Sequence, residues 1–205
     1  ITDRFLHSSD ISMMDIVLAT RNPGKAIEIG IFLQGLPVRI LSLEAFPEAT
    51  VLGDLRNSPL YYPEAFAAGR FRSVAAGDKI DLGGRTLRFL PAIIHDLPNT
   101  LWAWDDRTAT MFVSDAFGFS HYETSECTLF SDELPTAPTV ADSKQVLDLA
   151  LYWTRFAEKD GIIGRMEALF AEYPPRRIAP AHGSVVTQPQ ELAELMNEAL
   201  HATTR

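Results

Sequence analysis

Three side chains that suit a metal ion stand where short apolar runs of the sequence end. They are His95, Asp115 and His182. Neutral imidazole and carboxylate are ligands for zinc, iron or manganese, and loops held by a rigid sheet are where such ligands usually lie. Taken singly, each residue has a plainer interpretation, because a histidine after a strand is often a hydrogen-bonded loop residue and an aspartate often caps a turn. Together they predict a metal site.

Two predicted hairpins position the first two of these residues. Lys79 to Leu82 and Arg85 to Leu90 flank Gly83-Gly84, a dipeptide that readily adopts the positive φ angles of a tight turn. Leu101 to Trp104 and Met111 to Val113 repeat the pattern around a polar turn. His95 follows the first hairpin and Asp115 the second, whereas His182 follows a later apolar run that begins at Ile178.

Helical periodicity dominates the last third of the chain. Apolar residues recur every three or four positions in 141–159, 161–173 and 189–202, and Pro174-Pro175 ends the second segment. We expect the stripe of the first helix to face the sheet. It comprises Val146, Leu149, Ala150, Trp153 and Phe156.

The stretch from about 51 to 199 resembles the second half of the metallo-β-lactamase fold, most closely its flavodiiron branch. The resemblance rests on Gly77-Asp78, Leu82 to Leu87, Pro91 to Thr100, Phe112 to Gly118 and Pro180 to Gly183. It implies an α/β fold, a partial αββα sandwich. It also implies that His95 binds one metal, Asp115 bridges two and His182 binds the other.

Two departures from the family pattern concern the metal site. The family loop usually reads His-Trp-Pro-Asp, whereas this chain has His95-Asp96-Leu97-Pro98-Asn99. The family's earlier cluster, His-x-His-x-Asp-His or His-x-Glu-x-Asp, is missing, and His7 is the only histidine before His95. We therefore expect an incomplete or vestigial dinuclear site with one or two ions of iron or zinc. Either one ion binds to two histidines and one carboxylate, or a second chain in a homo-oligomer completes the site.

A completed flavodiiron-like centre would reduce O2 or NO at iron, and the wider fold would instead hydrolyse a small-molecule substrate with a metal-activated water. We expect no FMN-binding domain in these 205 residues, so a reductase would need an external electron donor. His121 is a candidate proton donor near the metal, although a solvated loop histidine is commoner.

A different pattern occupies the amino-terminal part. We predict strands at Ile16 to Ala19 and Val38 to Leu43, with a helix at Ala26 to Leu33. The turn from the first strand to this helix runs from Thr20 to Lys25. A lysine and backbone amides at a helix start stabilise an anion, so this turn is either a phosphate site or an ordinary connection.

Residues 16–47 resemble the amino terminus of the inosine triphosphate pyrophosphatases that remove non-canonical purine nucleotides. The resemblance implies phosphate contacts by Thr20, Asn22 and Lys25, but the rest of that enzyme is missing. We predict a flexible tail at 1–14, a β-α-β unit at 15–48 that extends the sheet, and the metallo-β-lactamase-like half at 49–205. The chain would then be a chimera, and a non-catalytic scaffold is the third alternative.

The composition of the chain argues against some classes of partner and of cellular location. A formal net charge of -9 argues against nucleic acid as a partner, since phosphate backbones are bound by clustered Lys and Arg. No apolar run approaches the roughly 20 residues that span a membrane. The single cysteine, Cys127, excludes an intrachain disulfide and favours a cytoplasmic setting.

Overall fold

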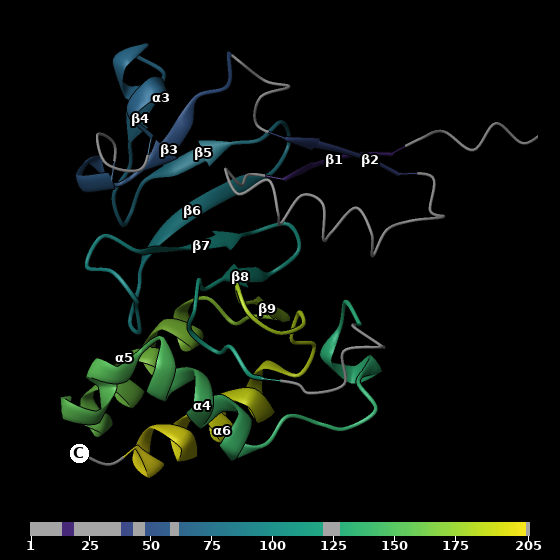
Figure 1. Ribbon diagram of the computed structural model, residues 1–205, viewed down its shortest axis with the longest axis vertical. Coiled ribbons are helices and arrows are strands. Elements are labelled where there is room, and N and C mark those ends of the chain that lie inside the picture. The colour runs from purple at the N-terminus through teal and green to yellow at the C-terminus, as the bar shows by residue number, and fades with distance from the viewer. Residues whose placement is uncertain (1–13, 19–37, 43–47, 58–61, 121–127, 204–205) are drawn as a thin grey trace, which may run out of the picture.

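A five-stranded mixed sheet forms the centre of the protein (Figure 1). The computed structural model describes residues 14–18, 38–42, 48–57, 62–120 and 128–203. The strand order is β5-β6-β7-β8-β9, antiparallel up to β8 and parallel between β8 and β9. The strands are β5 (Lys79–Asp81), β6 (Thr86–Pro91), β7 (Leu101–Asp105), β8 (Thr110–Phe112) and β9 (Arg177–Ala179).

Both predicted hairpins are confirmed. Gly83 and Gly84 have φ angles of 78° and 84°, which are accessible to glycine without strain, and they turn the chain from β5 into β6. The second turn connects β7 to β8, where the buried Asp105 accepts hydrogen bonds from the amide of Arg107 at 3.2 Å and the hydroxyl of Thr108 at 2.7 Å. Local turn chemistry therefore fixes the two hairpins that the sequence predicts.

Three α-helices pack beside β8 and β9 (Figure 1). They are α4 (Val140–Leu149), α5 (Lys159–Glu172) and α6 (Pro189–Ala202). Thr139 begins α4 with a reciprocal cap: its hydroxyl accepts from the Asp142 amide at 3.4 Å, and the Asp142 carboxylate accepts from the Thr139 amide at 2.9 Å. The α5 helix ends at Glu172, directly before Tyr173 and the two prolines.

The single helix predicted over 141–159 is wrong. The α4 helix ends at Leu149, and a separate 3-10 helix, η4 (Tyr152–Phe156), follows it. The predicted stripe is also displaced: Leu149 and Phe156 are 75% and 64% exposed, whereas Leu147 and Leu151 are fully buried. The chain leaves the helical conformation at Leu151, where φ is -121° and ψ is 34°, directly before η4.

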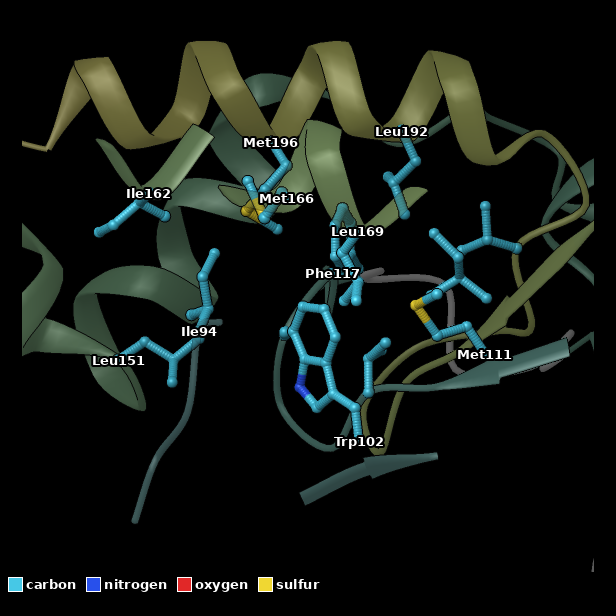
Figure 2. Packing of buried hydrophobic residues seen from close by; sticks show 14 of the residues in the cluster. Ile94, Trp102, Met111, Phe117, Leu151, Ile162, Met166, Leu169, Leu192 and Met196 are labelled. Atoms are coloured by element: carbon cyan, nitrogen blue, oxygen red, sulfur yellow. The ribbon is translucent and has the colours of Figure 1, made fainter. Parts of the chain in front are cut away.

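The hydrophobic core lies between one face of the sheet and the three helices. Figure 2 shows Trp102 and Met111 of the sheet pointing toward Leu192 and Met196 of α6. Trp102 and Met111 are fully buried, and burying a side chain of this kind contributes about 1.5–3 kcal/mol. This packing holds the sheet rigid under its loops.

Smaller elements precede the sheet in sequence. They are β1 (Met14–Leu18), β2 (Val38–Ser42), β3 (Val51–Gly53), η2 (Leu55–Asn57), α3 (Pro63–Ala67) and β4 (Phe71–Ser73), with η3 (Ser131–Glu133) later in the chain. The predicted strands in 16–19 and 38–43 are thus confirmed with small shifts. The predicted tail over 1–13 and the helix over 26–33 lie outside the described residues.

The predicted extension of the central sheet by the amino-terminal strands is not found among the described residues. β1 and β2 pair in parallel with each other, as a β-α-β crossover requires, but they form a separate two-stranded sheet. Both edges of the central sheet are unfavourable for added strands. β9 is bridged by Val186 through Ile178, and β5 has only three residues, with the charged Lys79 and Asp81 at its ends.

In the parts of the chain that the structure describes, no helix is both long enough and apolar enough to cross a membrane.

Candidate functional site

We call the end of the central sheet where β6, β8 and β9 terminate the site edge. The loops that carry the three predicted ligands leave the sheet there. β6 and β8 run in the same direction because each is antiparallel to β7, and β9 is parallel to β8. Their carboxyl ends therefore meet at the same edge. His95 follows β6, Asp115 follows β8 and His182 follows β9, so the topology directs all three loops to one region of the surface.

A strained, anchored loop presents Asp115. Ser114 and Phe117 have positive φ angles of 53° and 59°, a conformation that non-glycine residues adopt only at a cost. The surrounding fold holds them there: Phe117 is fully buried, and its ring stacks on Phe170 with centroids 5.5 Å apart. The result is a carboxylate that projects from a rigid backbone, with its side chain 13% exposed.

The loop after β9 brings His182 onto that carboxylate. The Ala181 amide donates to the Ser114 carbonyl at 2.6 Å, which joins the two loops. Next, Gly183 adopts a φ of 89°, and an added Cβ there would lie 3.1 Å from the Phe119 carbonyl oxygen. His182 Nε2 then lies 3.0 Å from Asp115 Oδ1, with the imidazole 55% exposed.

A second carboxyl group makes this pair electrostatically unusual. Burial raises the pKa of Asp115 above its ordinary value, and the negative charge of nearby Asp96 raises that pKa further. His182 opposes both effects. The Asp96 carboxylate also accepts a hydrogen bond from the Thr100 hydroxyl at 2.7 Å. Two carboxyl groups that repel each other beside an imidazole are suited to taking up a positive charge, either a proton or a metal ion.

His95 is held by a different set of contacts. Its ring stacks on the indole of Trp153, with centroids 5.3 Å apart and an interplanar angle of 28°. The indole Nε1 also donates to the backbone carbonyl of His95 at 2.7 Å. Ile94, the preceding residue, is fully buried and anchors the loop to the core.

The predicted residues are thus brought together in part. Asp115 and His182 are in direct contact, whereas His95 belongs to the same edge but packs on Trp153. His121 and the predicted phosphate ligands Thr20, Asn22 and Lys25 lie outside the described residues.

Two participants, Asp96 and Trp153, were not assigned to the site from the sequence. Asp96 had a signal, since it replaces the tryptophan of the family's His-Trp-Pro-Asp loop. Trp153 had none, because its approach to His95 depends on the helix break before η4.

A metal centre needs several donor side chains around each ion. Two imidazoles and two carboxylates at one edge suit a single ion of iron or zinc in donor type. They are too few for two ions, each of which needs several ligands. Within the described ranges, no three His, Cys, Asp or Glu side chains are grouped so that they could hold a metal ion. The donors therefore suit one ion in type but are not grouped around one point, and His95 would have to turn away from Trp153 to join Asp115 and His182.

A cavity of about 300 Å³ lies elsewhere, beside the start of α6. None of the predicted ligands lines it. Its walls include Phe119, Leu134, Val186, Glu191 and Leu192.

Solved structures identify the architecture. The chain superposes on the flavodiiron protein of Giardia intestinalis with a TM-score of 0.56 and 18% identity, covering 91% of this chain and 47% of that one. The protein adopts the metallo-β-lactamase fold. The rubredoxin oxygen:oxidoreductase of Desulfovibrio gigas gives a TM-score of 0.53 and 16% identity, over 92% of this chain and 44% of that one. The predicted metallo-β-lactamase-like fold is therefore confirmed.

Two oxidases are similar to this chain in sequence. The chain is 29% identical over 149 residues to a coenzyme F420H2 oxidase of Methanothermobacter thermautotrophicus, which covers 72% of this chain and 34% of the relative. A coenzyme F420H2 oxidase of Methanocaldococcus jannaschii is 28% identical over 138 residues, covering 64% and 31%. No protein-family model matches the chain. The chain thus spans about a third of the length of these relatives.

Proposed function

We propose that this chain carries a reduced metal site of the flavodiiron type, in which His95, Asp115 and His182 bind one ion of iron or zinc weakly. The observation that carries the proposal is the Asp115–His182 contact of 3.0 Å at the edge where β6, β8 and β9 end. Asp96 adds a negative charge beside Asp115, which favours a cation over a neutral ligand.

The chemistry that such an ion would supply follows from its class. Iron would transfer electrons to O2 or NO in a reduction, and zinc would polarise a water for hydrolysis. The flavodiiron structures and the coenzyme F420H2 oxidases favour the oxidoreductase alternative for this chain. Asp115 and His182, in contact across the two loops, would hold this ion together with His95.

A second chain is the source that we propose for additional ligands. On the face of the sheet opposite the core, Phe89, Ala103 and Phe112 are cross-strand neighbours, and Phe112 is 42% exposed. This apolar face ends at the edge that carries the site, so a chain packed against it would reach the site. Sedimentation of the protein with and without Zn²⁺ would test this, since a monomer in both conditions would contradict a shared site.

The deciding experiment measures metal content on protein purified anaerobically without a metal-affinity tag. We expect about one equivalent of iron or zinc, lost in His95→Ala and in His182→Ala. His201→Ala is the matched control, because that histidine is 56% exposed on α6 and should not affect metal content. Absence of metal in the unmodified protein under these conditions would refute the proposal and leave a scaffold role.

The amino-terminal prediction supports a separate candidate, nucleotide-phosphate binding by Thr20, Asn22 and Lys25. Its one structural support is the parallel pairing of β1 with β2, the frame that a β-α-β unit needs. Mg²⁺-dependent binding of inosine triphosphate that is abolished in Lys25→Ala is the expected result, and equal binding by both proteins would exclude it.

A further inference from the structure

Three segments that are distant in sequence enclose the cavity beside the start of α6. Phe119 comes from the loop after β8, residues 131–138 lead from η3 to α4, and Val186 and the first turns of α6 complete the wall. The volume of about 300 Å³ lies at the lower limit of the range that is typical of ligand sites. None of the predicted metal ligands lines the cavity, so its ligand does not depend on the proposed metal site.

Backbone hydrogen bonds hold the walls of this cavity in place. The Ser131 amide donates to the Val185 carbonyl at 2.9 Å, and the Val185 amide donates to the Leu129 carbonyl at 2.9 Å. The Thr187 amide donates to the Ser131 hydroxyl at 3.2 Å. These bonds join the η3 segment to the chain that enters α6. The cavity is therefore formed before a ligand arrives, which reduces the ordering that binding requires.

Most side chains that line the cavity are apolar. Phe119, Val186 and Leu192 are buried, and Leu134 and Leu195 are half-buried. A wall of this kind favours a ligand with an apolar body, because water leaves both surfaces on binding.

The charged groups at the cavity are two carboxylates. Asp132 and Glu191 line it beside the uncharged Ser131 and Gln188, and its described lining residues include no lysine, arginine or histidine. Both acids are exposed, and neither forms an ion pair or a side-chain hydrogen bond with a described residue. Two negative charges without a basic neighbour favour a cation at the solvent side of the cavity.

We propose that this cavity binds a small organic ammonium ion, with the apolar part of the ligand against the buried wall and the ammonium group beside Asp132 and Glu191. An inorganic cation would use the carboxylates but not the apolar wall. A neutral apolar molecule would use the wall but not the charges. An organic ammonium ion is the class of ligand that uses both.

Three probes of similar shape test the charge requirement: 2-phenylethylamine, 2-phenylethanol and 3-phenylpropanoate. Each is titrated into the ¹⁵N-labelled full chain while the backbone amide signals are followed. We expect the amine to bind most tightly and the propanoate most weakly, with shifts at Phe119, Val186 and Leu192. The preference for the amine should shrink as the salt concentration rises, because exposed charges are screened. Equal binding of amine and alcohol, shifts confined to other residues, or no binding of the amine would overturn the proposal.

Single substitutions then assign the preference to the two carboxylates. Asp132→Asn and Glu191→Gln each remove one charge with little change in shape. We expect each to weaken binding of 2-phenylethylamine about two- to fivefold, as for other exposed charge pairs, and to leave binding of 2-phenylethanol unchanged. Glu194→Gln is the matched control, because Glu194 is exposed on the same helix and does not line the cavity. If this control weakened the amine as much as Glu191→Gln, the net charge of the protein would explain the attraction, and the proposal would fail.

Discussion

At the scale of single residues, the ionised carboxylate of Asp115 lowers the stability of the metal-free protein. Burial and the charge of Asp96 raise its pKa, so the ionised carboxylate is destabilised in the folded state. Asp115→Asn keeps the shape and an acceptor for His182 but removes the charge. We expect the metal-free variant to be more stable by roughly 1 kcal/mol, or about 2–4 °C in Tm, while metal retention is lost.

The pH dependence of this effect has a definite sign. A carboxyl whose pKa is raised by folding contributes least stability when it is ionised, so the stability of the unmodified protein falls as the pH rises above the ordinary value of 3.8. The advantage of Asp115→Asn should therefore grow from acid to neutral pH in thermal melts. A variant that is less stable than the unmodified protein at pH 7 would contradict the electrostatic account.

Asp105 shows the opposite behaviour. Burial raises its pKa, but hydrogen bonds from Thr108 and Arg107 and the Arg85 guanidinium at 2.8 Å lower it by more, so the pKa lies below its usual range. Its stabilising contribution is present above the unfolded pKa and is lost as the pH falls through the folded one.

We expect Asp105→Asn to lose about 2 kcal/mol in urea denaturation at pH 7, because the buried acceptor and its charge are both weakened. The loss should shrink near pH 3. Asp160→Asn is the control, because this aspartate is 86% exposed and should change the free energy of unfolding little at either pH. A deficit that stays constant across this pH range would assign the effect to packing and not to charge.

At the scale of elements, the loop after β9 depends on one glycine. Gly183→Ala places a Cβ at a φ of 89° and within 3.1 Å of the Phe119 carbonyl oxygen, so we expect a loss of about 1–3 kcal/mol. Gly164→Ala, in the interior of α5, meets no atom within 4 Å and should gain about 0.5–1 kcal/mol. The two substitutions should thus shift the urea midpoint in opposite directions, and equal shifts would show that backbone strain is not the cause.

The elements that the sequence predicts are those specified by local chemistry. Gly83-Gly84 determines a hairpin through its own backbone freedom, and the proline pair after Tyr173 ends α5 without help from distant residues. The end of α4 at Leu149 has no such signal, since neither glycine nor proline stands there and the burial of Leu151 decides it. For the same reason Asp115 and His182 were predictable as strand-end residues, whereas the contact of Trp153 with His95 was not.

At the scale of the whole molecule, stability is distributed unevenly along the chain. The main hydrophobic core contains residues from Leu90 to Leu200 and unites β6 to β9 with the helices (Figure 2). β3 and β4 contribute no residue to this cluster and pair over three residues each. The site edge belongs to the well-packed part, which is where a rigid arrangement of ligands requires it to be.

Native-state hydrogen exchange should reveal this division. The Ile178 and Val113 amides, which donate to the carbonyls of Val186 and Ala179, should exchange only in global unfolding. The Val51 and Val74 amides, at β3 and β4, should exchange through local opening that needs less free energy. Leu147→Ala removes a fully buried side chain and should lower the free energy of unfolding by about 2–5 kcal/mol.

Leu147→Ala should speed the exchange of the Ile178 and Val113 amides and leave the exchange of the Val51 and Val74 amides unchanged. Leu149→Ala should alter neither pair, because Leu149 is 75% exposed. If all four amides accelerated together in Leu147→Ala, the strands β3 and β4 would belong to the same cooperative unit as the core. The site edge would then depend on the amino-terminal elements as much as on the helices.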